Sequence, residues 1–523
     1  MPRAGRAAMS AIDIKHNEVP TREKRLAAIT GYVGTVQDLE SRGSCRQIQN
    51  RDRCFTQASA CSSGCCQGQL ASIADAVIVN HASLGCAADS VAANVNFKSG
   101  AKIRDLVLTN IRIISTDLDE RDTVFGASAK LRQALIAAYE RYKPNAIFVT
   151  ASCVSGIIGE DIQSVLDELS PELGIPLVPA FCEGFKSKVW ASGFDAAFHA
   201  VLYGLVQPPR EQTNKVNYVN FRGSARKAII RTFSRFGVEP VFVLQHSTVE
   251  QLRLLSEAAA TVSICGTLGS YLGNGLEQHY GVPYLKTEQP HGIQGYENWL
   301  RALGIALNRE KEVEIFILAE EERIRPELEA LRQKLAGKTA VVGMGPSFGH
   351  NYVRVLRELG VDVIWAATWH FDQNYDHGGI PESTMRLAES QPNLKVSVGD
   401  QQNFEVVNLL HKLKPDLYVT RHPGSSIWAT KMGIATYMVT DEFSAFGFNG
   451  ILNFGNILVD KLTNSSLAKR LAARVKLPYT DWWMAQESFA LLKEPGALGP
   501  TREALDSVEA TESGLRPLRA VGA

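Results

Sequence analysis

The chain has 523 residues and is 45% hydrophobic, which supports several domains with sizeable cores. Lys+Arg and Asp+Glu both number 55, so the formal net charge is zero and gives no support for nucleic acid as a partner. No stretch is long and apolar enough to span a membrane, and no apolar segment follows the basic residues 1–6 as in a secretion signal. Nine cysteines, an odd number, argue against a simple disulfide framework and favour a reducing cytoplasm.

The first 50 residues are polar and weakly patterned, and we expect an extension that wraps around the core or stays mobile. Beyond them, short β-branched runs alternate with amphipathic helices, as at 146–150, 241–244 and 361–365. This alternation predicts an α/β fold in which parallel β-sheets are flanked by helices on both faces. From about Lys493 the chain is rich in Gly, Pro, Ala and Glu and indicates a tail.

The alternation also repeats along the chain. A helix that ends in glycine before an extended run occurs three times, at Gly174, Gly281 and Gly433. One copy would fit any doubly wound domain, but three at roughly domain spacing favour three related Rossmann-like domains. The boundaries that we predict are an extension over 1–50, domain I over 51–213, domain II over 214–336, domain III over 337–470, and a C-terminal extension over 471–523.

Three cysteines stand in distinctive glycine-flanked contexts. Cys61 begins the run Cys-Ser-Ser-Gly, Cys86 follows a glycine, and Cys153 begins Cys-Val-Ser-Gly directly after a predicted strand. Such thiolates favour metal ligation, with one iron–sulfur cluster as the simplest arrangement. Cys265 follows the run 261–264 at the equivalent strand end, where ligands bind in open α/β sheets. A cysteine is more often a small buried hydrophobe, which is our interpretation of Cys45, Cys54, Cys65, Cys66 and Cys182.

Histidine-bearing loops follow two strands of the predicted third domain. His370 lies in the loop 369–377 and His422 in the loop 421–426. These histidines are either solvated loop residues or proton donors and a metal ligand that face a buried cluster. The chain contains no G-x-x-x-x-G-K-[ST] and no G-x-S-x-G, so neither a P-loop for ATP nor a hydrolase nucleophile elbow is predicted.

From about Cys61 to Asn449 these residues resemble the catalytic component of nitrogenase, component 1. The likeness includes the 25-residue interval from Cys61 to Cys86, the run Cys-x-x-Gly-Ile-Ile-Gly-Glu-Asp-Ile at Cys153, and Cys265 ahead of the segment 280–283. The resemblance implies that Cys61, Cys86 and Cys153 bind half of a P-cluster-type [8Fe-7S] cluster. A homologous β (K)-type subunit of an α2β2 heterotetramer would share that cluster. Cys265 matches the cysteine that holds a complex iron–sulfur active-site cofactor in α (D)-type subunits.

The resemblance also implies an electron donor, an ATP-dependent homodimeric [4Fe-4S] reductase protein, which fits the absence of a P-loop here. Several positions depart from dinitrogen-reducing α chains. Trp190 and Phe194 replace a Gln and a His that face the cofactor, and Asn94 replaces an Arg. The stretch 438–443 lacks the expected cofactor histidine, so the second protein ligand is open, with His370, Asp441 and Glu442 as candidates.

An apolar, aromatic pocket suits a small thioether better than a substrate that needs many protonations. The chain is therefore most similar to the catalytic subunit of the nitrogenase-like methylthio-alkane reductases. This implies a small methylthio substrate, an iron-only cofactor without molybdenum, and His370, Trp190 and Phe194 at the catalytic site. Three alternatives stay open: a cofactor-assembly scaffold of the nitrogenase type, a dinitrogen-reducing α subunit, and a dark-operative protochlorophyllide reductase. Members of the last class lack a cysteine equivalent to Cys265.

Overall fold

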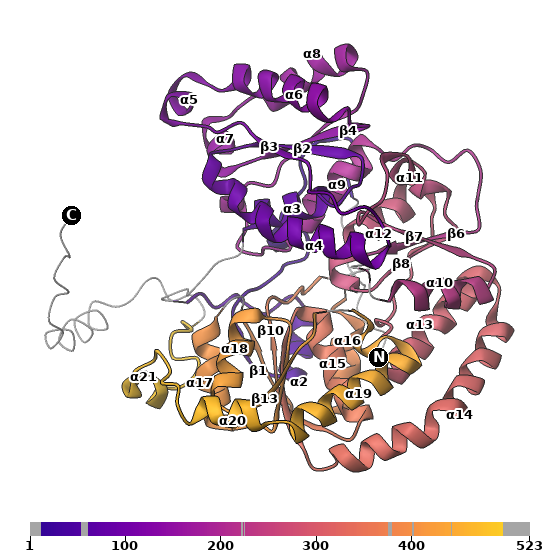
Figure 1. The fold of residues 1–523 in the computed structure, drawn as a ribbon, viewed down its shortest axis with the longest axis vertical. Helices are drawn as coiled ribbons and strands as arrows, with labels where there is room; N and C mark the ends of the chain where they lie inside the picture. Colours follow the sequence, from indigo (N-terminus) through magenta and orange to yellow (C-terminus); the bar gives the residue numbers. More distant parts are fainter. Residues whose placement is uncertain are drawn as a thin grey trace, which may run out of the picture.

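Three β-sheets with flanking helices organise the chain in the computed structural model, and their strands are parallel except for one edge strand of the third sheet (Figure 1). The structure describes residues 12–53, 61–220, 223, 225–374, 379–399, 402–440 and 442–494. This is the α/β architecture of parallel sheets and covering helices that the sequence predicts, and the prediction is confirmed. None of the helices within these ranges is long and apolar enough to cross a membrane.

The first sheet has the strand order β3-β2-β4-β5. Its strands are β2 (Ala76–His81), β3 (Ile113–Ser115), β4 (Ala146–Ala151) and β5 (Leu177–Ala180). Alternate residues face opposite cores, since Ile78 and Phe148 pack with one group of buried residues and Val79 and Val149 with another. The first core is shared with α3 (Ser62–Leu70) and α9 (Ser192–Gly204), the second with α6 (Ser128–Tyr142) and α8 (Ile162–Leu173). Burial of both faces explains the continuous apolar strands.

The second sheet has the order β7-β6-β8, and Cys265 follows its strand β8. Its strands are β6 (Lys215–Val219), β7 (Glu239–Phe242) and β8 (Ala260–Ser263). The helices that follow in the chain are α10 (Arg226–Arg235), α11 (Val249–Arg253), α12 (Gly266–Tyr280), α13 (Gly292–Leu307) and α14 (Glu310–Leu335). Gly281 ends α12 with φ of 72°, a left-handed conformation that suits glycine, as the sequence predicts.

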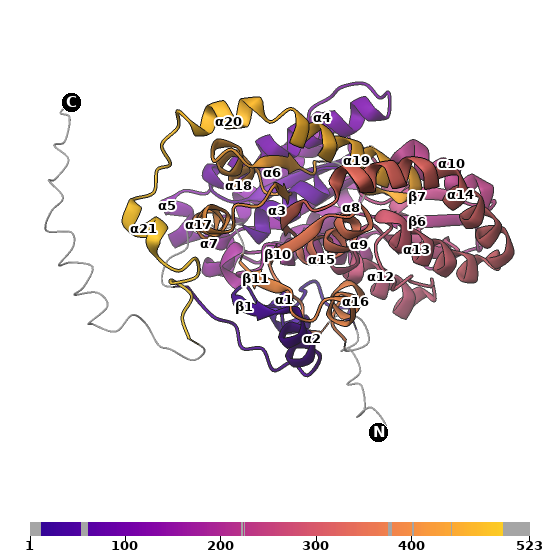
Figure 2. The same ribbon diagram turned by 90° about the horizontal axis from the view of Figure 1, so that it is seen from below.

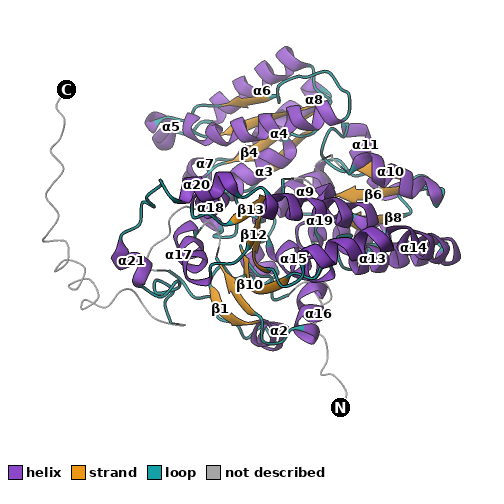
Figure 3. Ribbon diagram, turned by 60° about the horizontal axis from the view of Figure 1, so that its bottom comes forward, coloured by secondary structure: helices purple, strands orange, loops and turns teal. Residues whose placement is uncertain are grey.

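The third sheet has the order β1-β11-β10-β9-β12-β13, in which only β1 is antiparallel to its neighbour among the described strands. Its strands are β9 (Thr339–Met344), β10 (Asp362–Thr368), β11 (Lys395–Val398), β12 (Leu417–Thr420), β13 (Ala435–Met438) and β1 (Tyr32–Thr35). Helices α15 (Pro346–Glu358) and α19 (Gly447–Thr463) cover one face, and α17 (Asn403–Leu413) and α18 (Pro423–Lys431) the other (Figure 3).

The N-terminal residues belong to the packed structure. Strand β1 pairs with β11, and α2 (Val36–Ser44) lies beside α16 (Glu382–Ser390) (Figure 2). Arg53 binds Glu405 of α17 through two hydrogen bonds of 2.6 and 2.9 Å. The remaining elements are α1 (Arg22–Arg25), η1 (Leu84–Asp89), α4 (Ser90–Ile103), α5 (Glu120–Phe125), α7 (Cys153–Ile158), η2 (Gly184–Lys186), η3 (Leu255–Glu257), η4 (Glu442–Ala445), α20 (Ser466–Ala472) and α21 (Asp481–Ala485).

Apart from β1, the strands of each sheet begin in chain order at a central strand and are then added toward both edges. The chain leaves β2 for β3 on one side and returns to β4 on the other, and the same reversal separates β6 from β8 and β9 from β12. Ligands of open α/β sheets bind beyond the carboxyl ends of the strands at such reversals. The fold therefore defines three places where functional side chains are expected.

Candidate functional site

Cys153 lies at the reversal of the first sheet. His81 at the end of β2 pairs with Ala151 at the end of β4, and Cys153 opens α7 two residues later. Ser152 caps that helix in a reciprocal capping box with Ser155. Local capping thus holds the Cys153 backbone in place at the sheet edge.

The sulfur of Cys61 approaches the same point from another element. Cys61 is the N-cap residue of α3, and Gly184 lies between it and Cys153. A Cβ atom built on Gly184 would be 2.7 Å from Cys61 Sγ and 3.5 Å from Cys153 Sγ. Both sulfurs therefore flank one position that only a residue without a side chain leaves open.

Cys86 belongs to the same edge of the sheet. It lies in η1, five residues after β2, and η1 contacts α3, which Cys61 caps. Cys61 and Cys86 are exposed and Cys153 is half-buried, so this edge presents thiols outward. In the described part of the chain, no three His, Cys, Asp or Glu side chains converge tightly enough for a single metal ion. A cluster of several irons has a different requirement, because its thiolate ligands are spread over several irons and need not meet at one point.

Exposed apolar side chains lie close in sequence to these cysteines. Leu84, Ile157 and Phe185 are 64%, 73% and 56% exposed, and each lies within four residues of a candidate cysteine or of Gly184. Large exposed apolar side chains are common at protein–protein contacts. A cluster at this edge would be completed by a second chain.

Two further cysteines lie behind this edge and keep a structural role. Cys66 and Cys182 are buried, and the Cys182 thiol lies 3.6 Å from the Ala151 carbonyl. A hydrogen bond with Cys182, together with burial, raises the pKa of the Cys66 thiol well above its ordinary value. Cys66 is therefore a neutral thiol, which is a poor metal ligand.

Cys265 lies deep in the molecule, where the second and third sheets meet. It is 2% exposed, caps α12 after β8, and its backbone N–H donates to Ser263 Oγ at 3.2 Å. Its sulfur is 3.5 Å from Ser347 Oγ and 3.6 Å from Thr267 Oγ1. Ser347 is in the first turn of α15, directly after β9, so the reversal points of the two sheets face each other across Cys265.

His370 lies beyond the end of β10 and is 1% exposed. Neither ring nitrogen has a hydrogen-bond partner among the described residues, although Nε2 is 3.8 Å from Asp372 Oδ2. Burial and the nearby Arg22 charge hold the pKa of His370 well below its ordinary value, so the imidazole is neutral. Burial raises the pKa of Asp372 to about 6 against the opposing effect of Arg22. Sequence reasoning did not single out Asp372 or Arg22, which lie in no recognisable motif.

Three aromatic side chains form an adjoining wall. Trp190 packs on Phe194 with ring centroids 5.6 Å apart and on Trp369 at 5.9 Å. Phe194 and Trp369 directly precede the buried residues Asp195 and His370 in the chain. The sequence prediction included Trp190 and Phe194 but not Trp369, whose only signal was its place beside His370.

The other predicted positions lie as follows. Asn94 of α4 donates to Asn110 and accepts from the backbone N–H of Ile111, and so holds the chain before β3. Asp441 lies outside the described residues, as does Cys54, and the Glu442 side chain is likewise not described. His422 caps α18 and accepts from the Ser425 N–H.

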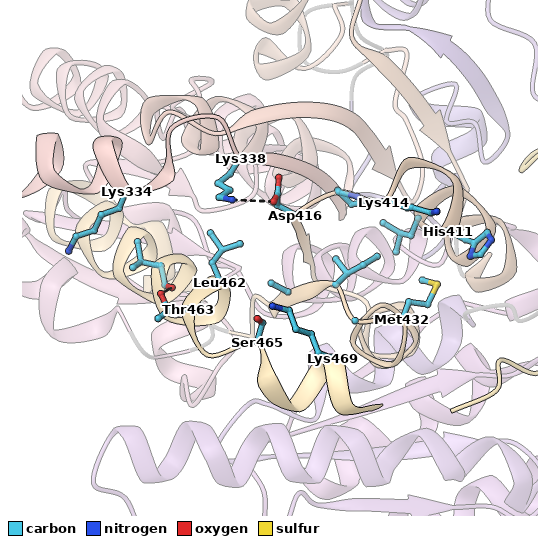
Figure 4. A pocket seen from close by; sticks show the side chains of 16 residues that line it. Lys334, Lys338, His411, Lys414, Asp416, Met432, Leu462, Thr463, Ser465 and Lys469 are labelled. Carbon is cyan, nitrogen blue, oxygen red and sulfur yellow. Dashed lines mark hydrogen bonds and ion pairs between the residues drawn. The ribbon is translucent and has the colours of Figure 1, made fainter. Parts of the chain in front are cut away.

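A separate hollow of about 950 Å³ lies at the opposite end of the third sheet (Figure 4). It is lined by Lys338 and Asp416, just before β9 and β12, and by Lys334, Lys414 and Lys469. Because these residues lie near the amino ends of the strands, this hollow is distinct from the cysteine sites at the carboxyl ends.

The fold and the cysteines at its sheet reversals define a class: a three-sheet α/β protein with thiol sites suited to iron–sulfur clusters. More narrowly, the chain belongs to the nitrogenase component 1 type oxidoreductase family, whose model matches residues 61–463. Members of this family bind complex iron–sulfur clusters and assemble with a β subunit and an iron protein. The chain is a component 1 subunit of either the catalytic α-chain kind or the NifE-like scaffold kind.

Individual relatives include both kinds. The nitrogenase iron-molybdenum cofactor biosynthesis protein NifE of Methanococcus maripaludis is 28% identical, over 77% of this chain and 83% of that protein. The nitrogenase molybdenum-iron protein alpha chain of Clostridium pasteurianum is 26% identical, over 77% of this chain and 85% of that one. The solved structure "Nitrogenase Cp1 at pH 5" matches with a TM-score of 0.65 at 26% identity, covering 81% of this chain and 91% of that chain.

Proposed function

We propose that this chain is the α-type catalytic subunit of a nitrogenase-like reductase that cleaves carbon–sulfur bonds of small methylthio-alkanes. In the reaction R–S–CH3 takes up two electrons and two protons and yields R–H and CH3SH. The electrons come from an ATP-dependent homodimeric [4Fe-4S] reductase protein. The carbon–sulfur bond breaks, carbon is reduced, and one proton is added to each fragment.

The aromatic wall of Trp190, Phe194 and Trp369 carries this proposal. Tryptophan and phenylalanine rings offer polarizable apolar surface, which a thioether sulfur and its methyl group contact favourably. A Gln and a His at 190 and 194 would instead place hydrogen-bonding groups there. The wall therefore favours an apolar substrate that binds more tightly when it leaves water and whose reduction needs few protons.

The cysteines present fit the clusters that the family binds. Cys61 and Cys153, with sulfurs on either side of Gly184, and Cys86 on the same edge would hold half of a P-cluster-type [8Fe-7S] cluster. The exposed apolar residues around them support a β (K)-type subunit in an α2β2 heterotetramer as holder of the other half. Cys265, buried beside unpaired polar atoms, would hold an iron-only active-site cofactor, which supplies the electrons for substrate reduction.

His370 would serve this site as a neutral imidazole. Because burial suppresses its charged form, it cannot store a proton at neutral pH, but one ring nitrogen donates while the other accepts. It could therefore pass protons to the substrate pocket or ligate the cofactor. Asp441 and Glu442 are the other candidates for that second ligand.

A cofactor-assembly scaffold is the second candidate function. The absence of a histidine over residues 438–443 and the 28% identity to NifE favour it. A scaffold would bind the same cofactor and release it without substrate turnover. A dinitrogen-reducing α subunit is the third candidate. It is disfavoured because Trp190 and Phe194 replace the Gln and the His of such chains.

The test is anaerobic purification of the complex with its β subunit and iron protein, followed by ATP-dependent turnover of dimethyl sulfide. We expect methanethiol and methane in equal amounts, with iron but no stoichiometric molybdenum in the complex. Cofactor transfer to a recipient protein without methanethiol formation would establish the scaffold function instead. Stoichiometric molybdenum together with ammonia formation from dinitrogen would refute the proposal.

A further inference from the structure

The short N-terminal helix α1 places one arginine at the junction of all three sheets. Arg22 is fully buried, and its guanidinium binds groups from three separate parts of the chain. Nη2 donates to Asp195 Oδ1 of α9 at 3.0 Å and to the Thr267 carbonyl of α12 at 2.6 Å. Nη1 donates to Asp372 Oδ2, beyond β10, at 3.2 Å.

Two of these contacts hold the surroundings of Cys265 and His370. Thr267 is in the first turn of α12, and its hydroxyl lies 3.6 Å from Cys265 Sγ. Asp372 Oδ2, the oxygen that accepts from Arg22, lies 3.8 Å from His370 Nε2. Arg22 is thus a strut between the turn that carries the cofactor cysteine and the loop that carries the histidine.

The junction keeps polar atoms that the described protein does not satisfy. Arg22 Nε, Asp372 Oδ1 and both ring nitrogens of His370 are buried and have no hydrogen-bond partner among the described residues. Buried polar atoms are nearly always paired, so several unpaired ones in one place indicate a bound polar group. Arg22 therefore lies beside a ligand-binding space and does not serve only to stabilise the fold.

We propose that Arg22 is a positioning residue of the Cys265 site and that the N-terminal segment completes this site. The planar guanidinium of Arg22 fixes the distance and orientation between Cys265 and His370, which the point charge of a lysine ammonium group could not do. The bound group is a negatively charged metal–sulfur cofactor. This inference depends on the proposed binding of that cofactor at Cys265 but not on the identity of the substrate.

Arg25 offers a matched control one helical turn away. It is 5% exposed and binds the same carboxylate, with Nη2 2.8 Å from Asp195 Oδ2. It contacts the Tyr271 ring and Ser270 Oγ, and among the described residues it forms no hydrogen bond or ion pair with Thr267 or Asp372. Both arginines form a buried ion pair with Asp195, but Arg22 forms a second one with Asp372, so only the Arg22 substitution affects the strut.

The experiment compares holo complexes that carry Arg22→Lys or Arg25→Lys. Thermal unfolding, iron content and the electron paramagnetic resonance spectrum of the cofactor are measured for both. We expect both variants to lose thermal stability, Arg22→Lys the more because it has two buried ion pairs. We expect an altered cofactor spectrum for Arg22→Lys alone, and turnover lowered by about 10- to 100-fold in that variant. Spectra that stay unchanged in both variants, or change equally, would overturn the positioning role.

Asp372→Asn removes the negative charge that Arg22 binds. This variant tests the proposal if the Arg22→Lys complex does not assemble. It keeps the side-chain shape, and we expect the same spectral change with normal iron content. An unchanged spectrum in this variant would refute the proposal. A Cys265→Ser complex that retains the wild-type cofactor signal would instead overturn the proposed function, so the two failures are distinguishable.

Discussion

Replacing Gly184 with alanine tests whether Cys61 and Cys153 serve one cluster. A Cβ at this position would lie 2.7 Å from Cys61 Sγ, whereas non-bonded heavy atoms pack best at about 3.5–4.0 Å. The sulfur must therefore move by about 1 Å. A thiol without a metal does so by rotating about its side-chain bond, so the cluster-free chain tolerates the change. A thiolate bound to iron cannot, and we expect cluster affinity to fall by about 10- to 100-fold.

Gly85→Ala is the matched control, because a Cβ at Gly85, next to Cys86, would meet no atom within 4 Å. Both variants are purified anaerobically with the β subunit, and iron, acid-labile sulfide and thermal unfolding are measured. We expect Gly184→Ala to unfold like the wild type in the cluster-free state but to lose cluster iron, while Gly85→Ala keeps it. Wild-type iron content and cluster spectrum in Gly184→Ala would refute the common site for Cys61 and Cys153.

Three further predictions follow from buried groups. Burial and two nearby arginines lower the pKa of His291 to about 3, so the unfolded chain binds a proton below pH 6.5 that the folded chain excludes. The free energy of unfolding therefore falls as the pH is lowered from about 6.5 toward about 3. Between pH 7.5 and 5.5 His291→Leu should lose about 1.4 kcal/mol less unfolding free energy than the wild type in urea titrations; equal losses would contradict this. Arg53→Met leaves the buried Glu405 carboxylate unpaired and should cost about 3–5 kcal/mol, with most of it regained when Glu405→Met is added; a small cost would show that the pair is solvated. Exchanging Trp190→Gln and Phe194→His should lower methanethiol formation about 10- to 200-fold at unchanged iron content, and an unchanged rate would remove the wall from substrate selection.

Local signals in the sequence predicted much of the architecture. The glycine after Leu173 takes φ of 68° and ends α8 before β5, as its pattern indicates. The run 146–150 forms most of β4, with both faces buried. These features depend on a few neighbouring residues, so periodicity and caps identify them. The strand ends that carry Cys153 and Cys265 follow from the same local signals.

Long-range contacts could not be predicted in this way. Tyr32–Thr35 is a strand only because β11, more than 350 residues later, offers an open edge, and its own sequence carries a weak signal. Arg22 likewise gains its place from Asp195 and Asp372, which are distant in sequence. Trp369 was missed because its partner Trp190 lies in the turn before α9, far away in the sequence.

The pairing of β1 with β11 also has a consequence for biosynthesis. The N-terminal segment leaves the ribosome first but cannot find its partner until residue 398 has been made. The first two sheets, which use contacts nearer in sequence, can fold while this segment waits. Closure of the junction by Arg22 is then a late event of maturation. Until residue 372 has been made, Arg22 cannot form its ion pair with Asp372, so the surroundings of Cys265 and His370 are completed only after synthesis of the third sheet has begun.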